Sequence, residues 1–150
     1  MPFEADFLEP TGDVNFLASQ EAELARALWK LGRHEEADVV SRSSQGRAAV
    51  EDWQAQAQWR QARSLVLASG GALEEAEELA RQAVRIAEDT DWVWIQGLGL
   101  ETLGIVLELR GNVVGAIGAF RGAMAVWEGK GNVVSAGRLK RTLQSLSPSA

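Results

Sequence analysis

The side chains that most often carry out enzyme chemistry are scarce in this chain. It has no cysteine and no tyrosine, and its single histidine is His34. Disulfides, thiolate metal sites, cysteine nucleophiles and most histidine acid–base catalysis are therefore excluded. The glycine-rich phosphate-binding patterns and the Gly-x-Ser-x-Gly nucleophile turn do not occur. We expect no enzyme activity, with no catalytic, cofactor-binding or metal-binding residue.

One short stretch, His34-Glu35-Glu36-x-Asp38, contains residue types that ligate metals. It has two interpretations: a divalent-metal site, or the acidic first turn of a helix. Negative charge in the first turn is favourable because the N-terminal end of the helix dipole is positive. We favour the helix start, because His34 and Asp38 alone form a poor ligand set.

Composition limits the class of protein and the kinds of partner. The chain has 150 residues, 46% of them hydrophobic and 24% charged, which is typical of one soluble domain or a short repeat array. A formal charge of −6 disfavours nucleic acid as a partner. There is no apolar run of membrane-spanning length, and the N-terminus lacks the basic start of a signal peptide. We expect a cytoplasmic protein without a membrane or nucleic-acid partner.

The charges are unevenly distributed along the chain. Residues 1–40 carry nine acids and three bases, whereas residues 110–150 carry one acid and six bases. Two interpretations stay open: chance surface composition, or an oriented contact with a neighbouring domain or subunit.

Proline and glycine positions predict helices separated by tight turns. The three prolines lie at positions 2, 10 and 148, so the interval between them lacks the main helix-breaking residue. Three segments also repeat one spacing, in which Gly follows Leu by four residues and Ala follows Gly by five. Their glycines recur at intervals of 39 and 40 residues. The copies are Leu24-Ala25-x2-Leu28-x3-Gly32-x4-Ala37, Arg63-Ser64-x2-Leu67-x3-Gly71-x4-Ala76 and Leu103-Gly104-x2-Leu107-x3-Gly111-x4-Ala116.

Each copy is typical of a helix, a glycine turn and a second helix. A second echo, Gly111-Asn112-Val113-Val114 against Gly131-Asn132-Val133-Val134, predicts that Gly ends one helix and Asn caps the next. One helical hairpin cannot bury its apolar stripe alone, but stacked copies can. We therefore predict an all-α fold: a leader over 1–12, one repeat domain over 13–147, and a tail over 148–150. The predicted helices are 14–31, 33–44, 49–69, 73–89, 92–110, 113–129 and 132–146.

These residues resemble the tetratricopeptide repeat family, whose pattern is W-x2-L-G-x2-Y-x8-A-x3-F-x2-A-x4-P. The third copy is the nearest match, reading Leu100-x2-Leu103-Gly104-x2-Leu107-x8-Ala116-x3-Phe120-x2-Ala123. The period is longer than the family's usual length of about 34 residues, and Arg63 stands where the family has Leu. The resemblance implies a right-handed α-α solenoid of about three helical hairpins plus a C-terminal capping helix. The chain is also similar to the C-terminal repeat arrays of large bacterial signalling proteins, which follow a cyclase, a STAND-type ATPase or a DNA-binding domain.

The family resemblance implies a binding surface on the concave face, formed by the first helix of each hairpin. The family's best-known groove grips a carboxylate with Lys and Asn, but the matching positions here hold Ala22, Arg26, Ala62, Leu98 and Thr102, so that clamp is absent. Either the face binds a protein or peptide segment, or it is solvated or covered within its own polypeptide. The partner-binding candidates are Arg26, Trp29, Lys30, Gln58, Gln61, Ala62, Leu65, Leu98, Glu101, Thr102 and Ile105.

Two further sets of residues are candidate interfaces. Of the six tryptophans, we assign Trp29, Trp59 and Trp127 to the interior, and Trp53, Trp92 and Trp94 to partial exposure at helix starts. Trp92 or Trp94 is a candidate anchor for a partner, because residues two apart on a helix point in different directions. Gly115, Gly118 and Gly122 form a small-residue stripe on one predicted helix. That stripe is either a weak stretch of helix or a close contact with another helix, as in a homodimer.

The sequence thus leads to two functional hypotheses. The first is a non-enzymatic protein–protein interaction module, a scaffolding or regulatory part of a bacterial signalling system. The alternative is a sensor module whose array binds a small ligand or signal peptide and regulates an upstream cyclase, ATPase or transcription factor. The first needs an open groove or flat apolar patch, whereas the second needs an enclosed pocket with converging polar groups.

Overall fold

The computed structural model describes residues 14–146, and the expected leader and tail lie outside these described residues. Over this range the chain forms seven α-helices and no strand. The all-α prediction is confirmed. The helices are α2 (Val14–Lys30), α3 (His34–Arg47), α4 (Trp53–Ser69), α5 (Leu73–Glu88), α6 (Val93–Leu109), α7 (Val113–Gly129) and α8 (Val133–Leu146).

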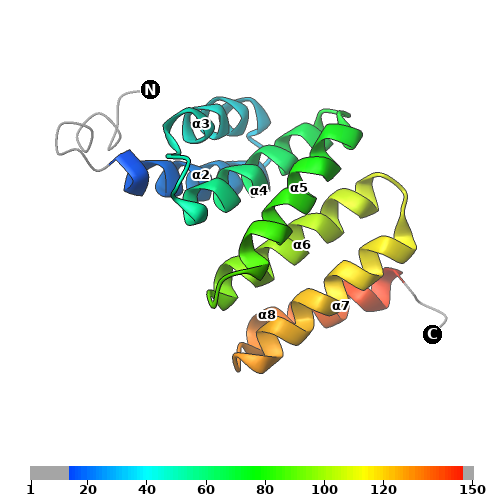
Figure 1. The fold of residues 1–150 in the computed structure, drawn as a ribbon. Coiled ribbons are helices and arrows are strands. Elements are labelled where there is room, and N and C mark those ends of the chain that lie inside the picture. The colour runs from blue at the N-terminus through cyan, green and yellow to red at the C-terminus, as the bar shows by residue number, and fades with distance from the viewer. Residues whose placement is uncertain (1–13, 147–150) are drawn as a thin grey trace.

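The helices follow one another as hairpins in a row (Figure 1). Helix α2 packs against α3, α4 against α5, and α6 against α7, while α7 also packs against α8. Neighbouring hairpins meet through their first helices, since α4 contacts both α2 and α6, and also through α3 against α4 and α5 against α6. The row therefore presents a continuous layer of first helices, on which the candidate binding residues were predicted.

The second hairpin begins later than the sequence analysis predicted. The predicted start was residue 49, but α4 begins at Trp53 and α3 continues to Arg47. The backbone of Ala48 is already extended, which ends α3. Asp52 then caps α4, because its side chain accepts a hydrogen bond from the Ala55 N–H at 3.1 Å. Because the backbone of Asp52 is also extended, α4 begins only after this residue.

A left-handed glycine ends the first helix of each hairpin, as predicted for Gly32, Gly71 and Gly111, whose φ angles are 80°, 93° and 86°. Gly131, the glycine of the second echo, adopts 78° after α7. In all four turns the next N–H donates to a carbonyl five residues earlier, which satisfies a free carbonyl at the helix end. These bonds are Arg33 N to Leu28 O, Ala72 N to Leu67 O, Asn112 N to Leu107 O and Asn132 N to Trp127 O.

The third hairpin is held together by aromatic rings that lie on glycine backbone. A Cβ added at Gly104 would lie 2.6 Å from the Phe120 ring, and one added at Gly97 would lie 2.5 Å from the Trp127 ring. Both rings come from α7, and both are almost fully buried. Helices α6 and α7 can pack this closely because α6 has no side chain at these two positions.

Gly104→Ala should therefore destabilise the protein by about 1–2 kcal/mol, because overpacking costs more than the helix propensity that alanine adds. Gly118→Ala is the matched control: it lies within α7, and nothing is within 4 Å of an added Cβ. We expect it to stabilise the protein by about 0.5–1 kcal/mol. Urea unfolding measures the change in the free energy of unfolding for both variants. Equal shifts in the two variants would contradict the proposed close packing at Gly104.

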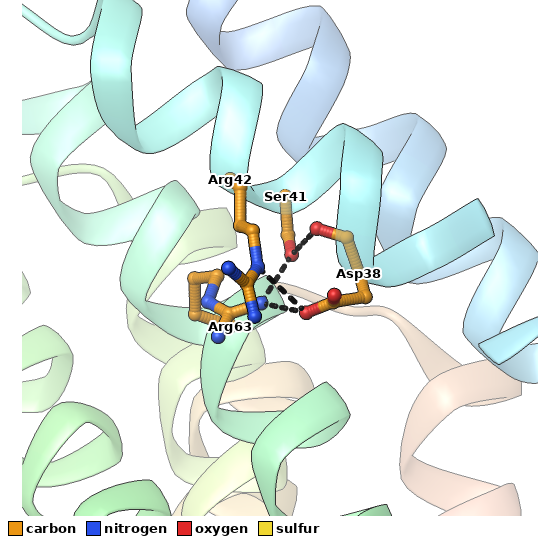
Figure 2. A network of polar contacts seen from close by, with 4 residues as sticks. All are labelled: Asp38, Ser41, Arg42 and Arg63. Carbon is orange, nitrogen blue, oxygen red and sulfur yellow. Dashed lines mark hydrogen bonds and ion pairs between the residues drawn. The ribbon is translucent and has the colours of Figure 1, made fainter. Parts of the chain in front are cut away.

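Arg63 lies at the junction of the first two hairpins (Figure 2). Its side chain is 8% exposed, and its Nη1 donates to Asp38 Oδ1 at 2.5 Å and to Ser41 Oγ at 3.1 Å. Both partners lie on α3, so the ion pair joins α3 to α4 where the repeat family has Leu. A guanidinium in this position is tolerated because it is paired.

The pair makes the junction sensitive to acid. Burial raises the pKa of Asp38, but the hydrogen bonds from Arg63 and Arg42 outweigh it and hold that pKa below its ordinary value. A carboxylate whose pKa is lower in the folded state stabilises above the unfolded pKa and loses that contribution as the pH falls.

Lowering the pH from 6 through about 4 and below should therefore destabilise the native chain more than the Asp38→Asn variant. The Asp38→Asn variant should start less stable at pH 6, because Arg63 loses its anionic partner. Urea midpoints across this pH range measure the difference. A constant gap between the two chains at every pH would show that Asp38 does not carry this dependence.

Candidate functional site

A groove of about 550 Å³ lies between α2 on one side and α8 on the other, with α6 between them. It is open to solvent, and its lining combines charged side chains with apolar surface. The lining residues are Glu23, Arg26, Ala27 and Lys30 of α2, Trp94, Leu98 and Glu101 of α6, Trp127 of α7, and Ser135 and Arg138 of α8.

Three cations face this groove from its two sides. Arg26 and Lys30 lie one turn apart on α2, and Arg138 lies on α8. Arg26 is held in place because its Nη1 donates to the Thr102 hydroxyl on α6 at 2.7 Å. This bond joins the first hairpin directly to the third.

Glu101 is the anion at the floor of the groove, and its carboxylate is fully engaged. It is 4% exposed. One oxygen accepts from Arg138 Nη1 at 2.5 Å, and the other accepts from the Trp127 indole N–H at 3.0 Å. Glu101 thereby connects α6, α7 and α8.

The three cations of the groove differ in how far they are compensated. Burial lowers the pKa of Arg26 to about 10, with Glu101 acting against this and Arg138 adding to it. Burial also lowers the pKa of Lys30; Arg26 and Arg138 lower it further, and Glu101 acts against them. The hydrogen bond to Glu101 instead raises the pKa of Arg138. An anion bound beside Arg26 and Lys30 would reduce the repulsion that Lys30 experiences.

A recess of about 20 Å³ extends the groove toward α4. It shares Glu23, Arg26 and Leu98 with the groove and adds Gln58, Gln61, Ala22 and Ala62. Two buried polar atoms here, Arg26 Nε and Gln58 Oε1, have no hydrogen-bond partner among residues 14–146. The recess therefore offers one free donor and one free acceptor.

The structure brings some of the predicted partner-binding residues together. Arg26, Lys30, Leu98 and Glu101 line the groove, and Gln58, Gln61 and Ala62 line the recess. Gln61 is also anchored to the backbone of α6, since its amide donates to the Ile95 carbonyl at 3.2 Å.

The other predicted partner-binding residues lie elsewhere. Leu65 is fully buried, and Thr102 is buried beneath Arg26. Ile105 packs against the hydrophobic core of the second and third hairpins. Trp29 stacks on His34 and donates to the Ser69 hydroxyl at 2.6 Å, at the turn end of α2.

Several groove residues were not among the sequence candidates. These residues are Glu23, Ala27, Trp127, Ser135 and Arg138. The Gly131-Asn132 echo repeats the turn before α7, so it predicts where α8 begins but not that α8 lines the groove.

The tryptophans divide between interior and surface as the sequence predicted. Trp59 and Trp127 are buried and Trp29 is partly buried, whereas Trp53, Trp92 and Trp94 are 38%, 42% and 48% exposed. Trp94 meets the buried Trp127 edge-on at 5.4 Å between ring centroids and lines the groove. Trp53 and Trp92 form a second edge-on pair at 5.6 Å, away from the groove.

The three glycines of α7 do not share one role. A Cβ at Gly115 would lie 2.7 Å from the Asn112 side chain, which caps the same helix by accepting from the Gly115 N–H. A Cβ at Gly122 would contact Leu100 at 3.4 Å, whereas Gly118 faces open space. Among residues 14–146, no other helix lies against Gly118.

The described residues contain neither a metal-ligand cluster nor a membrane-spanning helix. Between residues 14 and 146 no group of three or more His, Asp or Glu side chains is placed to hold a metal ion. Within the same range no helix is both long and apolar enough to span a bilayer. No family model matches the chain, and comparison with curated proteins gives no match.

Glu101→Ala should destabilise the protein by about 2 kcal/mol, because it leaves the buried Trp127 indole N–H without an acceptor and Arg138 without its anion. Glu108→Ala, an exposed position on the same helix, is the control and should change stability by less than about 0.5 kcal/mol. Denaturant unfolding followed by tryptophan fluorescence gives both values. A loss at Glu101 no larger than at Glu108 would show that this carboxylate does not hold the three helices together.

Proposed function

We propose that this chain is a non-enzymatic protein–protein interaction module that binds a peptide or protein segment in the groove between α2 and α8. The proposal includes a right-handed α-α solenoid of tetratricopeptide type. It also includes a regulatory or scaffolding role in a bacterial signalling system, as the sequence resemblance implies. The groove itself is the observation that carries the proposal.

The shape of the groove favours an extended segment. Its volume of about 550 Å³ lies between two separated helices and is open to solvent, so that an extended segment can lie in it without entering an enclosed pocket. A sensor for a small molecule would instead bury most of its ligand in an enclosed pocket. Trp94 and Leu98 provide the apolar contact, and the cations provide the polar contacts that fix register.

Photocrosslinking tests the binding face directly. A benzoylphenylalanine placed at Ala27, exposed on the groove side of α2, should crosslink a discrete set of protein segments in an extract of the source cell. The same probe at Val39, exposed on α3 outside the groove, is the control. Mass spectrometry of the crosslinked peptides identifies what was bound. Identical captures from both positions, or none from Ala27, would contradict binding in the groove.

A further inference from the structure

We propose that the segment bound in the groove is acidic, with carboxylates placed next to apolar side chains, and that it comes from a partner protein. This rests on the proposed function and adds the chemistry of the partner. The carboxylates would lie against Arg26, Lys30 and Arg138, and the apolar side chains against Trp94 and Leu98.

The distribution of charge is the first argument. The chain carries a net charge of −6, yet three of the five charged side chains that line the groove are cations. Arg138 and Glu101 form an ion pair, so their charges offset each other. Arg26 and Lys30 then face one remaining anion, Glu23, which is exposed at the rim. The groove therefore carries one excess positive charge on an acidic protein.

Unsatisfied hydrogen-bonding groups are the second argument. Arg26 Nε is buried and has no acceptor among the described residues, so it presents a charged donor to a carboxylate. Gln58 is 5% exposed, and its Oε1 has no donor. The recess has room for about one water-sized group, so a single carboxylate oxygen at its mouth would accept from Arg26 Nε.

Apolar surface beside the cations is the third argument. Trp94 is 48% exposed, and its ring meets Trp127 at the edge of the groove. Leu98 and Ala27 continue this surface between α6 and α2. Burying an aromatic or aliphatic side chain here provides affinity, whereas the charges select the sequence.

The test uses a fluorescein-labelled, end-capped peptide of about ten residues. Glutamates flank phenylalanines in it, with glycine and serine as spacers. A matched peptide has every glutamate replaced by glutamine. Fluorescence anisotropy with the full chain should show binding of the acidic peptide at least ~10-fold tighter than binding of the amide peptide, with an affinity that falls as salt rises.

Variants locate the effect in the groove. Lys30→Glu should weaken binding of the acidic peptide by about 10-fold or more, and Arg138→Gln should weaken it by several-fold. Lys140→Glu is the matched control, because it makes the same charge change at an exposed position on α8 outside the groove. It should change the affinity less than about 2-fold. Circular dichroism confirms that each variant is folded.

Several outcomes would overturn the acidic-partner proposal. Equal binding of both peptides would leave a peptide groove without charge selection, so the proposed function would survive and this inference would not. If neither peptide binds, the acidic-partner inference is rejected. The crosslinking experiment at Ala27 then tests the proposed function separately. An equal loss in Lys140→Glu would indicate general charge attraction. Displacement of the acidic peptide by inorganic phosphate at equal concentration would indicate a small-anion site.

The chain's own acidic start is the competing occupant. Residues 1–13 contain four acids and no base. In the full chain, Glu4→Gln, Asp6→Asn and Glu9→Gln together should leave the affinity for the acidic peptide unchanged within about 2-fold. A gain of about 10-fold would show that this segment occupies the groove in cis, and would overturn the assignment to a partner.

Discussion

The left-handed turn after each first helix sets how the two helices of a hairpin meet. Gly32, Gly71 and Gly111 place the chain in the same backbone conformation inside the three hairpins, and Gly131 repeats that conformation between α7 and α8. Because each hairpin folds back on itself in this way, the first helices α2, α4 and α6 lie next to one another in one layer. The groove is lined by α2 and α6 of that layer, together with α8 and Trp127 of α7.

The interior of this layer is unusually polar for a helical protein. Gln58, Gln61, Ser64, Glu101 and Thr102 are all buried on first helices. Most of them are tied to neighbouring helices or to backbone, so burial does not leave them without partners. Thr102, which the sequence analysis expected at the binding surface, is fully buried here and lies beneath Arg26.

The helices and turns were predictable because they depend on local sequence. The spacing of Leu, Gly and Ala and the Gly-Asn echo report backbone conformation over a few residues, and exposure of Trp53, Trp92 and Trp94 follows from their positions at helix starts. The groove was only partly predictable. Arg26 and Lys30 could be assigned from the repeat, but the contribution of Arg138 depends on how far the row of hairpins curves. Helix packing angles set that curvature, and no short motif encodes them.

The hydrogen bond from Arg26 to Thr102 has a consequence for how the chain folds. Repeat arrays are described as sums of nearest-neighbour terms, in which each hairpin depends only on the adjacent ones. The partners of this bond are 76 residues apart, in the first and third hairpins. Its formation requires all three hairpins to be in place, because the intervening chain must first be ordered. The bond therefore adds a cooperative term between the first and third hairpins. Unfolding of either hairpin breaks the bond and so destabilises the other.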